Sequence, residues 1–324
     1  MEKFSEPLYK FDPVQMITAL PGFINAIKMM HSIARYYNTS ERMTALFVKV
    51  TNQMITCCRN YILQDGKLWE QDRTRLIAKL KACIDLSESY QYYYRKTKLE
   101  LRMNPQGKQF DFSESAIFGK FDQFCWRVQK LIDLFTTVQQ FSALSESTIE
   151  NIQPIVKGFD DVLVELKRKK YNFLDYRSQL FDNDYMDFNY KIQGLEAKLV
   201  DFINQCFANS KSTRHSLQLL HQFRYILQQE SLQKLLDEKH RAIFKKYGDD
   251  VEKIMKIYNA YKDNPPLGRN APRVSGSIAW ARQLLRQVEQ PMELFKQTPA
   301  ILEAKVWNMQ SNDVVLGFFM ILFC

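Results

Sequence analysis

Apolar side chains recur every three or four residues along most of this chain, and that spacing constrains the fold more than any other feature. Side chains with this spacing lie on one face of an α-helix. Between residues 41 and 64 one such face comprises Met43, Phe47, Val50, Met54, Cys57 and Tyr61. The next segment repeats the pattern at Leu76, Leu80, Cys83, Ser87, Tyr90 and Tyr94. Because a lone helix cannot bury such a face, the two segments predict an antiparallel hairpin within a helical bundle.

The same spacing continues through the rest of the chain. It is found at residues 121–138, 155–166, 188–202, 217–236, 251–261 and 278–288. We find no run of alternating apolar and polar residues with β-branched enrichment and turn signals, which would indicate a β-sheet. The sequence therefore predicts an all-α fold made of successive antiparallel helical bundles.

The first helix is expected to be short or kinked. Asp12 can cap its start, and Pro13 suits the first helical position. Pro21 and Gly22 interrupt the segment soon afterwards. Proline lacks an amide hydrogen and clashes with the preceding turn, so it ends or bends a helix.

Proline and glycine also divide the chain into segments. Asn-Pro-Gln-Gly at residues 104–107 is a loop signal, and Pro265, Pro266 and Pro272 favour an extended connector. The predicted domains are an N-terminal helical bundle at 1–105, a long helical bundle at 106–262, a proline-rich connector at 263–275, a helical segment at 276–305 and an apolar C-terminal tail at 306–324. The apolar run in that tail, from Val314 to Cys324, is too short to cross a hydrocarbon layer of ~30 Å.

Charge and cysteine content limit the partners and the compartment. The 324 residues include 45 Lys and Arg against 36 Asp and Glu, which gives a net charge of +9. This balance favours acidic partners such as nucleic acid, anionic lipid or the acidic surface of a microtubule, without choosing among them. One alternative function is therefore a basic helical module that binds nucleic acid or an anionic surface. The six cysteines show no short-spaced framework and indicate a reducing compartment.

The residue patterns of common active sites are absent from the sequence. We find no P-loop, no Gly-x-Gly-x-x-Gly and no Gly-x-Ser-x-Gly motif. His215 and His221 are six residues apart and fall on different faces of a helix, while Cys57 and Cys58 are adjacent. We therefore expect no catalytic, cofactor-binding or metal-binding residues, and no enzymatic activity.

Tyrosines interleave with cations just before the predicted loop at 104–107. The cluster consists of Tyr90, Tyr92, Tyr93, Tyr94, Arg95 and Lys96. Such a pattern could form a stacking platform for single-stranded nucleic acid. Two of the tyrosines lie on the predicted apolar face, so core packing accounts for half the signal and interface contact for much of the rest.

Residues 264–285 resemble a signature near the end of the first N-terminal region of dynein heavy chains. They read Asn-Pro-Pro-Leu-Gly-Arg-Asn-Ala-Pro-Arg-Val-Ser-Gly-Ser-Ile-Ala-Trp-Ala-Arg-Gln-Leu-Leu. Three shorter motifs occur in the order that axonemal heavy chains show, at residues 35–43, 121–125 and 133–137. The resemblance runs from about Tyr9 to Ala304 and is closest to axonemal heavy chains of the outer-arm type.

This resemblance implies the tail, or stem, of a heavy chain, an elongated fragment built of helical bundles. In the family the tail joins heavy chains to one another, carries intermediate and light chains, and anchors the motor to its doublet microtubule. The implied partners are other dynein heavy, intermediate and light chains, with only indirect association with microtubules, no nucleic acid and no membrane. The implied location is the cytoplasm and cytoskeleton, in the axoneme of a cilium or flagellum.

The resemblance also bears on catalysis. The family's ATPase motor ring lies far downstream of this region, so the expected function is a non-catalytic scaffold for assembly in microtubule-based ciliary movement. Residues 306–324 depart from the family, as expected for a chain truncated before the motor.

Four arginines around the connector form the candidate partner interface: Arg269, Arg273, Arg282 and Arg286. Arginine is enriched in protein interfaces. The alternative is that these side chains pack the connector onto its own bundle.

Overall fold

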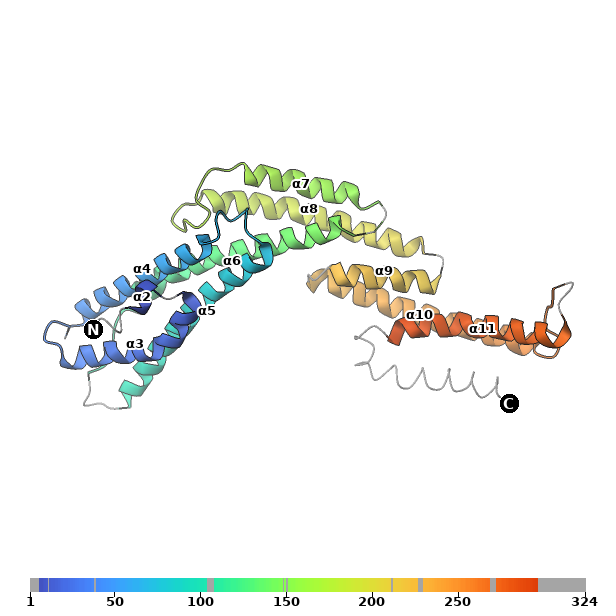
Figure 1. The fold of residues 1–324 in the computed structure, drawn as a ribbon, viewed down its shortest axis with the longest axis horizontal. Helices are drawn as coiled ribbons and strands as arrows, with labels where there is room; N and C mark the ends of the chain where they lie inside the picture. Colours follow the sequence, from blue (N-terminus) through green and yellow to red (C-terminus); the bar gives the residue numbers. More distant parts are fainter. Residues whose placement is uncertain are drawn as a thin grey trace. The chain divides into compact units, whose positions relative to one another are not determined.

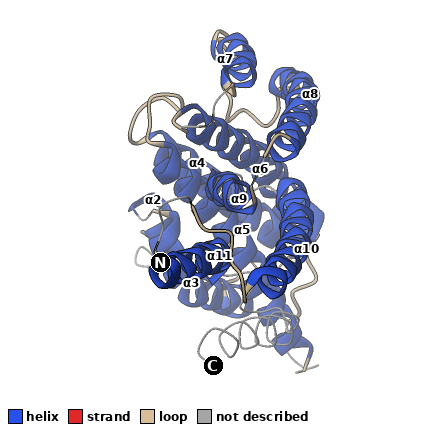
Figure 2. Cartoon of the chain, turned by 90° about the vertical axis from the view of Figure 1, so that its right-hand side faces the viewer, coloured by secondary structure: helices blue, strands red, loops and turns tan. Residues whose placement is uncertain are grey.

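A computed structural model describes residues 6–10, 12–37, 39–103, 108–147, 149, 151–210, 212–226, 230–268 and 272–296. Within these residues every regular element is an α-helix, which confirms the predicted all-α class (Figure 1, Figure 2). The helices are α2 (Pro7–Lys10), α3 (Pro13–Ile33), α4 (Ser40–Leu63), α5 (Arg73–Arg102), α6 (Glu114–Ser145), α7 (Gln153–Lys167), α8 (Leu180–Ala208), α9 (Thr213–Ile226), α10 (Glu230–Tyr261) and α11 (Arg273–Lys296). Of these described helices, none combines the length and apolar character that crossing a membrane requires.

The chain divides into two compact units. Unit 1 contains residues 1–146 and 156–194, and unit 2 contains residues 147–155 and 195–324. The predicted boundary at residue 106 falls inside unit 1, because α5 and α6 on either side of it pack against each other. A loop signal shows where a helix ends, but it does not show whether the next helix folds back onto the same core.

Unit 1 is built on a bundle of the four helices α3 to α6. Helix α5 packs against α3 and α6, and α4 packs against α6. The largest fully buried side chains of this bundle are aromatic, at Phe47, Tyr90, Tyr94, Phe121, Phe124 and Phe135. Each large apolar side chain contributes ~1.5–3 kcal/mol when it is fully buried. The shared aromatic core therefore stabilises the helices together.

The predicted apolar faces match this core fully on α5 and partly on α4. All six predicted positions of α5 are buried. On α4, Cys57 and Tyr61 are half-buried, whereas their neighbours Cys58 and Ile62 are fully buried. Helix α4 contacts α2, α3, α5 and α6. Its core face is therefore wider than one stripe, and spacing alone could not show which edge is covered.

Of the two alternatives predicted for the helix after Asp12, short or kinked, the short helix was wrong. Asp12 does cap α3, since its Oδ1 accepts a 2.7 Å hydrogen bond from the amide of Gln15. The helix then continues through Pro21 to Ile33. An interior proline costs ~3 kcal/mol, which is less than the combined burial of the α3 side chains around it. Those buried side chains are Met16, Leu20, Phe23, Ile24 and Ile27.

Unit 2 contains α9, α10 and α11, which pack against one another, together with the C-terminal part of α8. Phe223 and Phe295 are fully buried in it. Helix α11 continues through Pro291 to Lys296, within the predicted helical segment. Of the predicted connector, residues 263–268 and 272 are non-helical and residues 273–275 begin α11. The predicted tail, 306–324, and residues 297–305 of the predicted helical segment lie outside the described residues.

Candidate interaction surfaces

The structure separates the arginines that the sequence grouped as one interface. Arg282 and Arg286 lie one turn apart on α11, and both are exposed. Arg273 precedes Arg282 by nine residues, which is half a rotation around the helix at about 100° per residue. It is exposed on another side of α11. Arg269 lies outside the described residues.

A shallow depression runs along the exposed side of α11, and we name its lining the arginine face. Its lining residues are Ser275, Ile278, Ala279, Arg282, Gln283, Arg286, Gln287 and Gln290. Among these described residues none is acidic. At the margin, Nη1 of Arg214 from α9 donates a 3.0 Å hydrogen bond to Oε1 of Gln290.

The helix beneath the arginine face is firmly packed. Leu284 and Val288, on the opposite side of α11, are buried. The hydroxyl of Tyr247 on α10 donates a 3.0 Å hydrogen bond to the carbonyl oxygen of Val288. The ring of Tyr247 lies 5.4 Å from that of Phe295. The arginine face is therefore presented by a helix that packs against α9 and α10.

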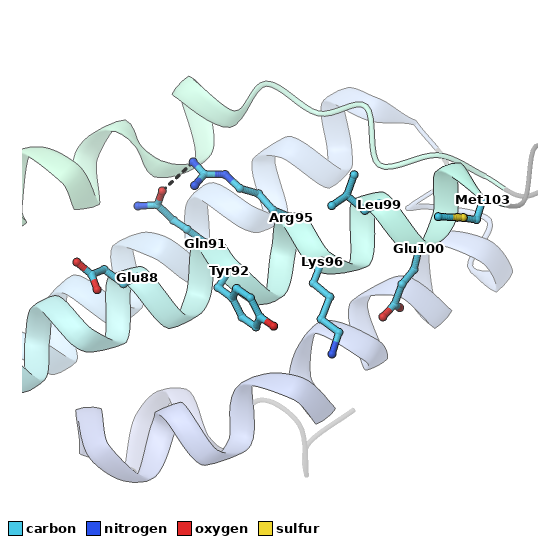
Figure 3. A pocket seen from close by; sticks show the side chains of 8 residues that line it. All are labelled: Glu88, Gln91, Tyr92, Arg95, Lys96, Leu99, Glu100 and Met103. Carbon is cyan, nitrogen blue, oxygen red and sulfur yellow. Dashed lines mark hydrogen bonds between the residues drawn. The ribbon is translucent and has the colours of Figure 1, made fainter.

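A second exposed face lies on α5 (Figure 3). It is lined by Glu88, Gln91, Tyr92, Arg95, Lys96, Leu99, Glu100 and Met103. Tyr92, Leu99 and Met103 are 60%, 61% and 88% exposed. Arg95 is already paired, since its Nε lies 3.3 Å from Oε2 of Glu114. This face is apolar with balanced charges, and so it favours no partner by charge.

The structure shows which residues of the predicted tyrosine cluster lie in the core and which lie on the α5 face. Tyr90 and Tyr94 are fully buried, as the core interpretation predicted, and burial is the main cause that raises the pKa of each hydroxyl. Tyr92 and Lys96 are both exposed, and their side chains project from the same side of α5 (Figure 3). Of the predicted stacking pattern, the surface therefore carries one exposed tyrosine, Tyr92, beside the cations Arg95 and Lys96.

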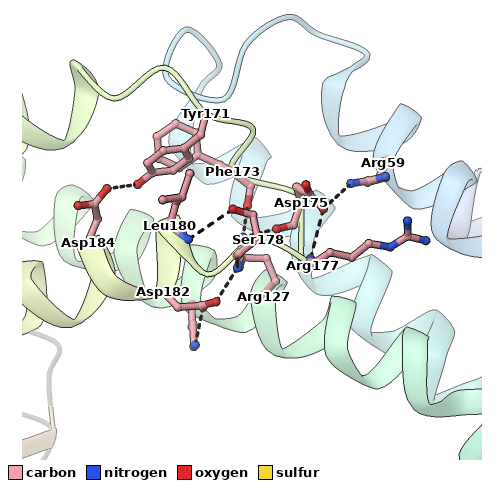
Figure 4. Close-up of polar contacts among 11 residues, drawn as sticks. Arg59, Arg127, Tyr171, Phe173, Asp175, Arg177, Ser178, Leu180, Asp182 and Asp184 are labelled. Carbon is pink, nitrogen blue, oxygen red and sulfur yellow. Dashed lines mark hydrogen bonds and ion pairs between the residues drawn. The ribbon is translucent and has the colours of Figure 1, made fainter.

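A buried arginine fastens the segment before α8 onto α6 (Figure 4). Arg127 of α6 is only 3% exposed. Its guanidinium donates hydrogen bonds to the carbonyl oxygens of Phe173, Asp175 and Ser178 at 3.3, 2.7 and 2.7 Å, and to Oδ2 of Asp182 at 2.8 Å. It also lies 4.8 Å from the centre of the Phe181 ring. We name this group the Arg127 cluster.

Asp182 balances the buried charge. Its Oδ1 accepts a 2.7 Å hydrogen bond from Nζ of Lys130, which also belongs to α6. Burial alone would raise the pKa of Asp182, but Lys130 and Arg127 outweigh burial and hold the pKa below its usual range. Nearby, the hydroxyl of Tyr171 donates a 2.7 Å hydrogen bond to Oδ2 of Asp184. These contacts fix the start of α8 on the bundle.

The Arg127 cluster was missed in the sequence, although a signal for it existed. Arg127 follows Phe124 by three residues and precedes Leu131 by four, so it lies on the apolar stripe of α6. A charged residue on such a stripe requires paired and hydrogen-bonded partners. The partners themselves are loop carbonyls about fifty residues away, and no local pattern identifies them.

The cysteines and histidines form no reactive group in the described structure. Sγ of Cys83 lies 4.0 Å from the carbonyl oxygen of Cys58. A hydrogen bond with Cys83, together with burial, raises the pKa of the Cys58 thiol, and burial raises that of Cys125 to about 12. Such thiols stay protonated and react slowly. His215 and His221 are exposed, and no three His, Cys, Asp or Glu side chains in the described ranges could hold a metal ion together.

Comparison with known proteins decides the family. The chain matches the model of "Dynein heavy chain, N-terminal region 1" over residues 1–313. It belongs to this family. Two relatives with similar identity are the dynein gamma chain of the flagellar outer arm from Chlamydomonas reinhardtii, at 43% over 306 residues, and dynein axonemal heavy chain 5 from Rattus norvegicus, at 44% over 305 residues.

These matches cover nearly all of this N-terminal region and little of each relative. They include 94% of the chain and 7% of the gamma chain, and 93% of the chain and 9% of heavy chain 5. The dynein beta chain of the Chlamydomonas outer arm is more distant, at 24% identity. The resemblance to axonemal heavy chains of the outer-arm type is therefore confirmed.

Proposed function

We propose that this chain is a non-catalytic part of the tail of an axonemal dynein heavy chain and serves as a scaffold for assembly with other dynein chains. The observation that carries the proposal is the match to N-terminal region 1 over residues 1–313. Exposed helix faces on rigid bundles suit such a role, because helix faces are a common way for proteins to recognise partner helices.

The partners we propose are dynein heavy, intermediate and light chains, with microtubules bound only through the assembled complex. The similarity to a flagellar outer-arm chain and to an axonemal heavy chain supports a location in the axoneme. The match lies in the tail region, and the chain spans less than a tenth of these relatives. We therefore propose that the chain hydrolyses no ATP itself and contributes to movement as a structural part.

A pull-down tests the scaffold function. The full chain, carrying an affinity tag, is incubated with a detergent-soluble extract of cilia, and the bound proteins are identified by mass spectrometry. We expect dynein intermediate, light or heavy chains above the level bound by an unrelated helical protein with the same tag and similar charge. Recovery of no dynein chain above that level would contradict the proposal.

The alternative function, a basic module for nucleic acid or an anionic surface, receives no support from these matches. The charged residues also argue against it, because many basic side chains already pair with acidic ones within their own unit. Examples are Lys79 with Asp65 at 2.7 Å and Lys98 with Glu114 at 2.7 Å. Paired cations release few counterions on binding a phosphate backbone, so they add little affinity.

A further inference from the structure

We propose that the arginine face of α11 binds an acidic amphipathic helix of a partner chain. This inference rests on the proposed scaffold function and names the chemistry of the partner at one surface. The arginine face is preferred to the α5 face because its charge has one sign. The α5 face carries Glu88 and Glu100 beside Arg95 and Lys96, so its charges balance.

The two arginines of the face are available for a partner. Among the described residues, neither Arg282 nor Arg286 forms a salt bridge or a side-chain hydrogen bond. They are separated by one helical turn, which places their side chains ~6 Å apart. A second helix with acidic residues four positions apart presents carboxylates at the same spacing. Each arginine can then hold one carboxylate through two parallel hydrogen bonds.

An apolar contact at one end makes the face specific for an amphipathic helix. Ile278 is 49% exposed and lies one turn before Arg282, with Ala279 beside it. An apolar side chain on the partner, one turn from its acidic pair, would pack on these two residues. Gln283 and Gln287 flank the arginines and can supply hydrogen bonds without adding charge.

Acidic residues of α11 itself limit the length of the site. Glu289 and Glu293 do not line the arginine face, but they follow Arg286 by three and seven residues. An acidic partner that extended beyond Gln287 would meet Glu289, which lies one turn after Arg286 on the same side of α11, and would be repelled. The site therefore spans residues 275–287, which is about three and a half turns of helix.

A charge-reversal experiment on the full chain tests this surface. The probe is an alanine-rich synthetic helix of roughly 15 residues with Glu at positions i and i+4 and Leu one turn earlier. Its counterpart carries Lys in place of both Glu residues. Binding is measured by fluorescence anisotropy at ~50 and ~300 mM NaCl, where screening differs strongly. The wild-type chain is expected to bind the Glu probe at least ~10-fold more tightly than the Lys probe, a difference of about 1.4 kcal/mol.

The variant Arg282→Glu with Arg286→Glu is expected to reverse this preference. Its control is Lys245→Glu with Lys246→Glu, which changes the net charge equally at two exposed positions of α10. The control variant should bind as the wild-type chain does. Circular dichroism shows whether each variant keeps its helices. Failure of the wild-type chain to bind the Glu probe, or an equal loss in both variants, would overturn the proposal.

The pull-down separates this inference from the scaffold function. If the wild-type chain and the arginine variant recover the same dynein chains, and the wild-type chain does not bind the Glu probe, only the proposal for the arginine face is rejected. Binding of the Glu probe without recovery of any dynein chain would reject the scaffold function instead. Loss of a particular dynein chain in the arginine variant only would support both.

Discussion

At the scale of single residues, Arg127 decides how the segment before α8 is attached. Taking a guanidinium out of water costs several kcal/mol unless its donors are satisfied. Three backbone carbonyls and the carboxylate of Asp182 meet that cost, because charge-assisted hydrogen bonds are stronger than neutral ones. Residues 173–182 are thus held on α6 mainly through Arg127, while Lys130 of α6 and Arg59 of α4 add further contacts to Asp182 and Leu174.

Replacement of Asp182 by Asn is expected to make the stability of unit 1 less dependent on pH. Lys130 and Arg127 hold the pKa of Asp182 below its usual range, near 3.9 in an unfolded chain. A depressed pKa contributes stability that is complete above that value and is lost as the pH falls through the folded value. We therefore expect Asp182→Asn to cost about 1–3 kcal/mol at pH 7, since the site is partly exposed, and progressively less as the pH falls from ~3.9 through the folded value.

Urea unfolding followed by circular dichroism at several pH values measures this difference. Asp187→Asn is the control, because Asp187 is exposed on the same helix. A deficit that stayed constant from pH 7 to about pH 3 would show that the charge of Asp182 does not carry the effect.

At the residue scale, the sequence predicted which side chains are buried but not all of their partners. The apolar spacing identified core positions such as Leu80 and Tyr90, because periodicity reports which side of a helix is buried. It could not reveal the hydrogen bonds of Arg127, because three of its acceptors belong to a distant loop and the fourth, Asp182, to the helix that follows it. Arg282 and Arg286 could be placed on one face from their spacing, while the separation of Arg273 required the start of α11 to be known.

At the scale of elements, packing overrides local signals. Pro21 and Pro291 both interrupt the helical pattern in the sequence, yet α3 and α11 continue through them. Each helix has buried residues on both sides of its proline, as Leu20 and Phe23 show in α3. Helix existence was therefore predictable from apolar periodicity, whereas helix ends depended on neighbours that the sequence does not display.

Helix α5 offers a direct test of this packing argument. Leu80 is fully buried against the bundle, and Leu99 on the same helix is 61% exposed. Leu80→Asp places a carboxylate in an apolar core and is expected to cost more than ~4 kcal/mol, enough to unfold unit 1. Leu99→Asp is expected to change the free energy of unfolding by no more than ~0.5 kcal/mol.

Circular dichroism melting curves of both α5 variants decide the matter. The Leu80 variant should lose helical signal at a temperature where the Leu99 variant still follows the wild-type curve. Equal melting temperatures for the two variants would mean that the face carrying Leu80 is not the one that holds α5 in the bundle.

At the scale of the whole molecule, the chain forms two units, and two of their three borders fall inside helices, after residue 155 in α7 and after residue 194 in α8. Unit 1 includes residues 156–194, which return to it after residues 147–155 have joined unit 2. Helix α8 contributes residues to both units. Loop signals could not reveal this division, because the unit that a segment joins depends on non-local contacts. The loop signal at residues 104–107 separates α5 from α6, and these two helices pack against each other in unit 1.

Each unit has its own aromatic core, so the two are expected to lose stability separately. Phe223 is fully buried in unit 2, with its ring 6.4 Å from that of Phe202 and 6.2 Å from that of Phe207. Phe223→Ala removes a large buried ring and should cost ~3–5 kcal/mol within unit 2. Hydrogen exchange measured by mass spectrometry on the full chain should show faster exchange in α9, α10 and α11, with α3 to α6 unchanged.

The corresponding substitution in the core of unit 1 completes this test. Phe121 is fully buried in unit 1, and Phe121→Ala should speed exchange in α3 to α6 while α9 to α11 keep their protection. Local opening follows cooperative units, and so the peptides that respond together define the unit. If either substitution sped hydrogen exchange equally in both sets of helices, the two aromatic cores would belong to one cooperative unit. A load applied to one unit of this tail would then be resisted by the stability of both.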